Sequence, residues 1–111
     1  MVAFIKHIVM FRLKDECGEA DLEIVREGLR ALPAKIPAIV KHELGADLRL
    51  DGGQTHPLGK NRQLAWSVYF EDVSAYDDYD RSDAHREFLR DVMAPRLEPG
   101  SRAAIQYEVD A

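Results

Sequence analysis

Three features are scarce in this sequence, and each scarcity argues against a class of protein. Cys17 is the only cysteine among 111 residues, so no intramolecular disulfide can form and the chain suits a reducing compartment. Lysine and arginine (15) are outnumbered by aspartate and glutamate (20), and the net charge of −5 disfavours nucleic acid as a partner. No apolar run approaches the roughly 20 residues that a membrane-spanning helix needs, and the N-terminus lacks the pattern of a signal peptide. We therefore expect a cytoplasmic protein with no membrane partner.

The residue patterns of common cofactor sites are also missing. The sequence contains no HxH, HExxH or CxxC motif, which argues against a transition-metal site. Gly52 and Gly53 lie in a loop without the GxGxxG or GxxxxGK pattern of a phosphate cradle. The acidic residues between Glu71 and Asp83 are typical of a solvated helix surface. We predict a protein that works without a cofactor or a metal.

The sequence does contain enough apolar residues to form one hydrophobic core. With 46% hydrophobic residues, the chain has room for a single domain over residues 1–111. Alternating apolar residues predict strands over residues 3–13, 38–50, 63–71 and 102–109. Apolar residues at helical spacing predict helices over residues 20–36, 73–80 and 82–96, and residues 51–62 form the obvious loop.

Several local features refine these elements. Pro33 and Pro37 mark the end of the first helix, and Gly45 predicts a bulge or bend in the second strand. Ser82 or Asp83 is the expected N-cap of the last helix. The inward face of that helix is predicted to carry Phe88, Leu89, Val92 and Met93.

The order β-α-β-β-α-β predicts an α+β, ferredoxin-like fold, with a four-stranded antiparallel sheet and helices on one face. In the first strand, one face carries His7 and Val9, while Phe4, Ile8 and Met10 point to the other. The helices can cover only one of these faces, and a soluble monomer rarely exposes a contiguous apolar patch of that size. We therefore expect a homodimer that pairs through the open sheet face.

A histidine at the centre of the first apolar strand is the least expected residue. Lys6-His7 is followed, in the last third of the chain, by Tyr79 and His85. Together with residues 5–11, 43–47 and 68–72, this order of motifs resembles the stress-responsive dimeric α/β-barrel (Dabb) family. Two departures stand out, because Ser82-Asp83 replaces the usual His-Pro, and Gln106-Tyr107 replaces the usual Asp-Tyr or Asp-Phe.

The resemblance implies a site. In relatives that cyclise polyketides without a cofactor, the residues equivalent to His7, Tyr79 and His85 line an apolar pocket between sheet and helices. It implies an aldol-type ring closure on a small hydrophobic or aromatic molecule, with His85 as general base, Tyr79 as hydrogen-bond donor and His7 as orienting partner. Some relatives hold a divalent ion on main-chain carbonyls, which would fall near residues 30–36 here.

The residues leave other interpretations open. His7 could be a hydrogen-bonded core histidine, Tyr79 could pack at a helix edge with its hydroxyl in water, and His85 could bond to the main chain. The protein could be a non-catalytic dimerisation or stress-protective module, whose pocket Trp66 and Phe88 would fill. A cofactor-free monooxygenase-like barrel is a third alternative.

Overall fold

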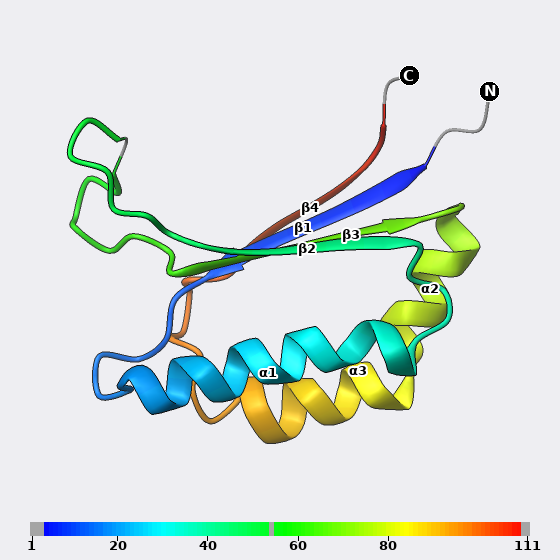
Figure 1. Cartoon of the computed structure of the whole chain (residues 1–111), viewed down its shortest axis with the longest axis horizontal. Coiled ribbons are helices and arrows are strands. Elements are labelled where there is room, and N and C mark those ends of the chain that lie inside the picture. Colours follow the sequence, from blue (N-terminus) through cyan, green and yellow to red (C-terminus); the bar gives the residue numbers. More distant parts are fainter. Residues whose placement is uncertain (1–3, 54, 110–111) are drawn as a thin grey trace.

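The described chain forms one sheet with all its helices on one side. The computed structural model describes residues 4–53 and 55–109. Four antiparallel strands pair in the order β2-β3-β1-β4, namely β1 (Ile5–Phe11), β2 (Lys41–Ala46), β3 (Leu64–Phe70) and β4 (Ala103–Glu108). Beneath them lie α1 (Glu19–Lys35), α2 (Val73–Arg81), α3 (Asp83–Phe88) and the π-helical turn η1 (Leu89–Met93) (Figure 1). The predicted ferredoxin-like α+β fold is confirmed.

The second strand is shorter than the alternation predicts. β2 ends at Ala46, and Asp47 then turns the chain by accepting a 3.0 Å hydrogen bond from the main-chain N–H of Arg49, which adopts a φ of 54°. This local side-chain bond competes with the sheet ladder. The predicted bulge at Gly45 is wrong, because Gly45 pairs with Ala65 in an unbroken register. β1 is likewise shorter than predicted, and beyond it Leu13 forms only an isolated bridge.

The helices also differ from their predicted bounds. Pro33 lies inside α1, which continues to Lys35, because a proline near the helix end removes only one main-chain bond. The predicted helix over residues 82–96 is divided, since α3 gives way at Leu89 to a π turn in which Ala94 N–H donates to Leu89 O at 2.8 Å. The wider turn leaves Leu89 42% exposed, although Leu89 still lines the cavity between the sheet and the helices. Ser82 is the N-cap of α3, as predicted.

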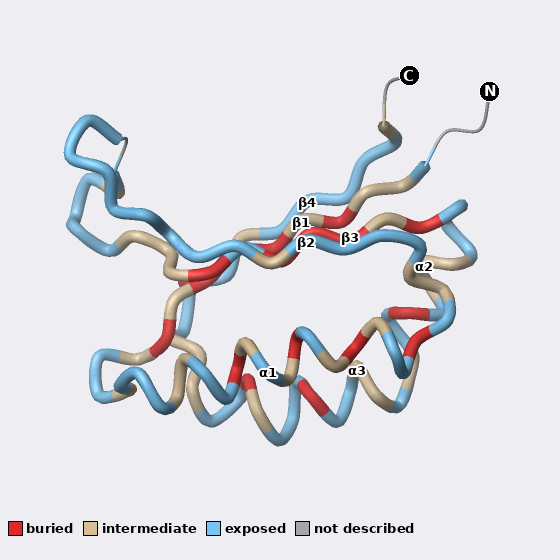
Figure 2. Tube along the Cα trace, in the orientation of Figure 1, coloured by how far each residue is buried: buried red, intermediate tan, exposed pale blue. Residues whose placement is uncertain are grey.

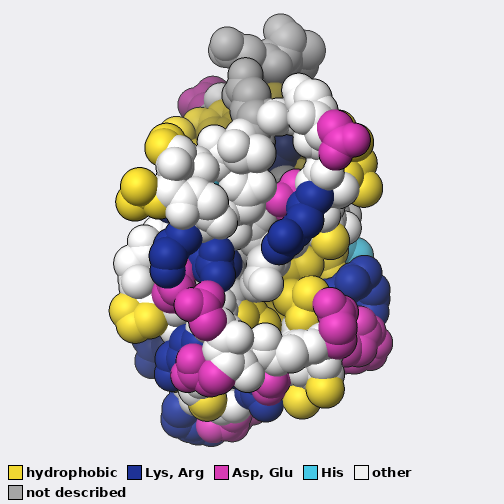
Figure 3. Space-filling view, turned by 90° about the vertical axis from the view of Figure 1, so that its left-hand side faces the viewer, with side chains coloured by type: hydrophobic (Ala, Val, Ile, Leu, Met, Phe, Trp, Pro, Cys, Tyr) yellow, Lys and Arg dark blue, Asp and Glu magenta, His cyan; other side chains and the backbone are white. Residues whose placement is uncertain are grey.

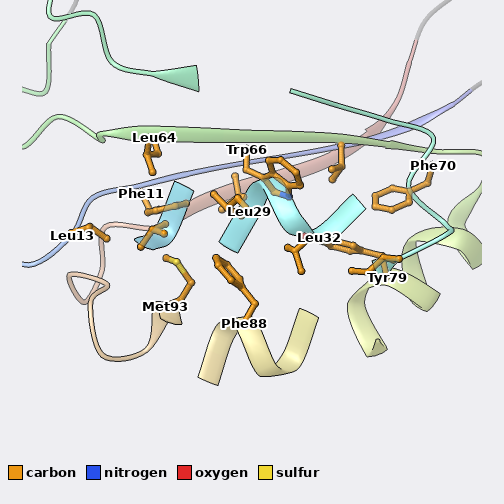
Figure 4. Packing of buried hydrophobic residues seen from close by; sticks show 14 residues of the cluster. Phe11, Leu13, Leu29, Leu32, Leu64, Trp66, Phe70, Tyr79, Phe88 and Met93 are labelled. Atoms are coloured by element: carbon orange, nitrogen blue, oxygen red, sulfur yellow. The ribbon is translucent and has the colours of Figure 1, made fainter. Parts of the chain in front are cut away.

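The core lies between the sheet and the helices. Side chains from β1 and β3 alternate inward and meet an apolar stripe of α1 (Figures 2 and 4). A Cβ at Gly28 of α1 would overlap the ring of Phe88, so the absence of a side chain there lets α1 and α3 approach closely. The buried apolar residues are Val9, Phe11, Leu13, Val25, Leu29, Leu32, Ile36, Leu64, Trp66, Val68, Phe70, Tyr79, Phe88 and Met93.

The opposite face of the sheet carries no helix of the described chain (Figures 1 and 2). Apolar side chains remain exposed along it, with Met10 at 42%, Ile105 at 59% and Tyr107 at 38%. The register pairs Met10 with Ala103 and Lys6 with Tyr107, which places these residues on the same face. This is the bare apolar face that the first strand predicts.

Charged side chains of both signs are intermingled at the loop end of the molecule (Figure 3). Glu98, for example, lies 3.0 Å from the Arg12 guanidinium and 3.2 Å from the Lys60 ammonium. Within the described ranges, no helix is long and apolar enough to cross a membrane.

Candidate functional site

A cavity of about 250 Å³ lies between the sheet and the helices. Most of its wall is apolar and comes from β1, α1, α2, α3 and η1, with Trp66 contributed by β3. The three residues predicted to share a pocket, His7, Tyr79 and His85, all line it. Trp66 and Phe88 also belong to this wall, but they leave the cavity open rather than filling it. The cavity therefore has room for a small molecule.

His7 is buried at the centre of β1, with 3% of its surface exposed. Its Nδ1 lies 2.7 Å from Nε2 of Gln106, the residue paired with it on β4. An amide nitrogen only donates, so Nδ1 accepts this bond and the ring proton sits on Nε2. Burial, with smaller contributions from Arg102 and His85, lowers the pKa of His7 to about 4. At neutral pH His7 is an uncharged N–H donor and a weak base.

Tyr79 projects from α2 and is 2% exposed, so the interpretation that its hydroxyl sits in water at a helix edge is wrong. Its ring centroid lies 5.9 Å from that of His7 and 4.4 Å from that of His85. Burial raises the pKa of Tyr79 to about 12, although the nearby indole of Trp66 opposes that rise. The hydroxyl consequently keeps its proton and can donate.

His85 stands in the first turn of α3 and is half-buried. Ser82 connects it to Tyr79, because Ser82 Oγ accepts from the His85 main-chain N–H at 3.2 Å and donates to the Tyr79 carbonyl at 3.0 Å. The Nδ1 of His85 lies 3.2 Å from the main-chain oxygen of Asp80. A carbonyl oxygen only accepts, so Nδ1 carries a proton and Nε2 keeps its lone pair. The main-chain bond expected in one interpretation exists and still leaves a free basic nitrogen.

The wall contains further polar residues that sequence reasoning missed. Tyr76 lies one helical turn before Tyr79, its ring is 5.6 Å from His7, and burial raises its pKa. The i, i+3 spacing of the two tyrosines on α2 was the available signal. Arg102 and Asp80 are exposed, line the cavity, and form no ion pair with another described residue. They place one charge of each sign at its edge.

No metal site emerges from the described part of the chain. Among residues 4–53 and 55–109, no three His, Cys, Asp or Glu side chains are grouped so that they could hold an ion. His42 stacks against Trp66 with ring centroids 5.8 Å apart, and His56 accepts a hydrogen bond from Leu58 N–H. Both are therefore engaged in local packing or loop structure.

The sheet order, the helices on one face and the cavity between the layers define a ferredoxin-like protein of the α/β-barrel type. The family described as "Stress responsive A/B Barrel Domain" matches residues 5–109, and the chain belongs to that family. No curated protein sequence matches the chain significantly.

Solved structures agree with this assignment. A dimeric ferredoxin-like protein of unknown function from Thermobifida fusca shares 29% identity, with 96% of this chain and 92% of that chain covered and a TM-score of 0.78. A dimeric protein of unknown function from Bacteroides fragilis also shares 29% identity, with 96% of each chain covered and a TM-score of 0.73. A hydroxynitrile lyase from Passiflora edulis shares 18% identity over 99% of this chain and 96% of that chain, with a TM-score of 0.79, and thus the fold.

Proposed function

We propose that the protein is a homodimer whose cavity binds a small hydrophobic or aromatic carbonyl compound and removes a proton from the carbon beside that carbonyl. The proposed outcome is aldol-type ring closure without a cofactor, as in polyketide-cyclising relatives. One observation carries the proposal. A histidine with a free Nε2 stacks at 4.4 Å on a buried, protonated tyrosine at the edge of an apolar cavity.

His85 is the proposed general base. The Asp80 carbonyl holds its Nδ1–H, which fixes the tautomer and turns Nε2 into the proton acceptor. The proton moves from the substrate carbon to Nε2, and the electron pair passes to the carbonyl oxygen as an enolate. The enolate carbon then attacks a second carbonyl of the same molecule, and His85 returns the proton to the new alkoxide.

Tyr79 and His7 are the proposed donors to the enolate oxygen. With its pKa near 12, the Tyr79 hydroxyl gives a hydrogen bond without losing its proton at neutral pH. His7 is too weak a base to compete for the substrate proton, since its pKa is about 4, and its Nε2–H is free of the Gln106 contact. Donors held in a desolvated wall stabilise developing negative charge more strongly than water does.

The open cavity supports this proposal over a non-catalytic module. A purely structural module would be expected to fill the space with its own side chains, yet about 250 Å³ remains beside Trp66 and Phe88. No observation on the described residues favours a monooxygenase-like reaction.

The dimer is proposed from the open sheet face. Exposed Met10, Ile105 and Tyr107 form an apolar surface on one side of β1 and β4, and structural neighbours are dimeric. Two such faces packed around a two-fold axis would each bury more than the roughly 800 Å² per partner of a standard interface. Sedimentation at micromolar concentration tests this, because a monomer would contradict it.

Hydrogen–deuterium exchange at carbon tests the proposed chemistry. Acetophenone, incubated with the protein in D2O and followed by proton NMR, is expected to exchange its methyl hydrogens faster than in buffer. His85→Ala should abolish the acceleration, Tyr79→Phe should reduce it about 10²-fold, and His56→Ala in the loop should leave it unchanged. Acceleration that survives in His85→Ala would contradict the assignment of the base.

A further inference from the structure

The cavity wall contains a hydrogen-bond donor with nothing to donate to. Trp66 is 1% exposed, and its indole Nε1 has no hydrogen-bond partner among the described residues. β3 places Trp66 between its register partners Val9 on β1 and Leu44 on β2, on the side of the sheet that faces the helices. Figure 4 shows the indole extending from the sheet towards the helix layer. Trp66 is also one of the residues that line the cavity.

An unpaired donor in such a place is costly. A buried N–H without a partner costs about 1–3 kcal/mol, and buried tryptophans usually find a partner for this group. Burial raises the pKa of Tyr79 and hydrogen bonding from the Trp66 indole opposes that rise, so the Tyr79 hydroxyl is a candidate acceptor close to this N–H, although the two groups do not meet in full hydrogen-bond geometry. His42 stacks against the indole ring and does not satisfy the N–H. No described group therefore accepts from the indole N–H in full hydrogen-bond geometry.

Two neighbouring polar groups of the wall are also hydrogen-bond donors. His7 presents an Nε2–H, because its Nδ1 accepts from Gln106, and Tyr79 presents a hydroxyl. Beside these donors, His85 Nε2 is an acceptor. A wall with this excess of donors is complementary to a ligand that carries an oxygen acceptor inside an otherwise apolar body.

We propose that Trp66 is a ligand-binding residue, and that its indole N–H donates to an oxygen of the ligand, so that the cavity selects carbonyl-bearing apolar molecules over hydrocarbons of the same shape. The inference rests on the proposed function only in taking this cavity as the ligand site. It adds a residue and a selection rule that proton abstraction by His85 does not require.

A matched pair of probes tests the selection. Acetophenone and α-methylstyrene have nearly the same planar shape and differ in carrying C=O or C=CH2. Acetophenone is expected to bind about three- to tenfold more tightly, the ratio that one net hydrogen bond supplies. Trp66 is the only tryptophan in the sequence, so its single indole N–H resonance reports the contact directly. That resonance should move downfield with acetophenone and stay nearly unchanged with α-methylstyrene.

Two variants separate the hydrogen bond from cavity shape. Trp66→Phe should lower the ratio of the two affinities to what the Tyr79 and His7 donors supply alone, whereas Phe88→Leu, which changes an apolar part of the same wall, should keep the ratio of the unmodified protein. If Trp66→Phe does not fold, replacement of Trp66 by benzothienylalanine removes the N–H and preserves the bicyclic shape.

The outcomes distinguish the two proposals. Equal affinities of the two probes for the unmodified protein, with an unmoved indole resonance, would overturn the role of Trp66 and leave the apolar binding site standing. An N–H satisfied only by buried water would give this result. Failure of both probes to bind at millimolar concentration would overturn the binding site and the inference together.

Discussion

The two faces of the sheet are formed by the same strands but differ in how far they are covered. On the helix side, Val9 and Trp66 are covered, yet the space between them and the helices is incompletely filled and contains a cavity. On the other side, Met10 and Ile105 remain uncovered, at 42% and 59% exposed. A gap inside a covered layer is suited to a small molecule, whereas an uncovered flat layer is suited to another protein surface. The alternation of one strand thus separates the proposed ligand site from the proposed dimer surface.

The largest effect is expected on the open face. Ile105→Asp places a carboxylate where two apolar sheets would meet, so the dimer should weaken by at least about 10³-fold, since like charges brought together at an interface cost several kcal/mol. Leu58→Asp is the control, because Leu58 is also exposed, at 79%, but lies in the loop. Analytical ultracentrifugation should find a monomer only for the first variant. A dimer that survives Ile105→Asp would place the interface elsewhere.

On the helix side, the burial of His7 should make the free energy of unfolding depend on pH. His7 has a folded-state pKa of about 4 against 6.5 when exposed, so the unfolded chain binds more protons between these values and stability falls as pH falls through that window. We expect unfolding by urea to require about 2 kcal/mol less at pH 5 than at pH 7 from this group alone.

His7→Asn should remove most of that difference, and His56→Asn should not. The same pH dependence in the protein and in His7→Asn would show that another group causes it.

A smaller effect, on ligand affinity, is expected when the Phe88 ring is pushed into the cavity. Gly28→Ala puts a methyl group against the Phe88 ring, and the space that this ring can enter is the cavity it lines. We expect acetophenone affinity to fall about tenfold. The free energy of unfolding should fall by only about 1 kcal/mol, because the higher helix propensity of alanine offsets part of the strain of overpacking. Gly52→Ala, which meets nothing within 4 Å, is the control. Unchanged affinity in Gly28→Ala, measured by titration calorimetry, would mean that Phe88 moves elsewhere.

The smallest effect concerns the exposed partner of His7. Gln106→Asp replaces an amide donor with a carboxylate, which favours the charged imidazole, so the pKa of His7 should rise by about 1, at the low end for a neighbouring opposite charge because Gln106 is exposed to solvent. Proton NMR titration of the histidine ring signals measures this. Gln106→Leu removes the amide without adding charge and should lack the rise. A pKa that stays near 4 in Gln106→Asp would show that burial alone governs His7.

Much of the fold was predictable because it depends on short-range pattern. Alternation in β1 indicated which side chains are buried, and the spacing of apolar residues indicated α1. The errors arose where tertiary contacts override pattern. The turn at Asp47 shortens β2, the pairing of Gly45 with Ala65 removes an expected bulge, and a π turn beginning at Leu89 divides the last helix. None of these three features can be detected from apolar residues that recur every 2 or every 3.6 positions.

The candidate site was predictable in part. Resemblance indicated that His7, Tyr79 and His85 would share a pocket, and all three line one cavity. Their chemical roles stay predictions. The contact between His7 and Gln106 joins residues 99 positions apart and requires the β1–β4 register. The orphaned N–H of Trp66 is a property of its surroundings, which no local motif encodes.

The corner at Ser82 explains a spacing that a continuous helix could not use. Tyr79 and His85 are six residues apart, and at about 100° per residue a straight helix would place their side chains roughly 120° apart around its axis. Ser82 instead ends α2 and begins α3, and the change of axis brings the two rings to 4.4 Å. The two rings therefore meet because the chain changes direction between α2 and α3, and not because of their spacing along one helix. Insertion of one residue at this corner would separate the two rings while leaving the composition of the pocket intact.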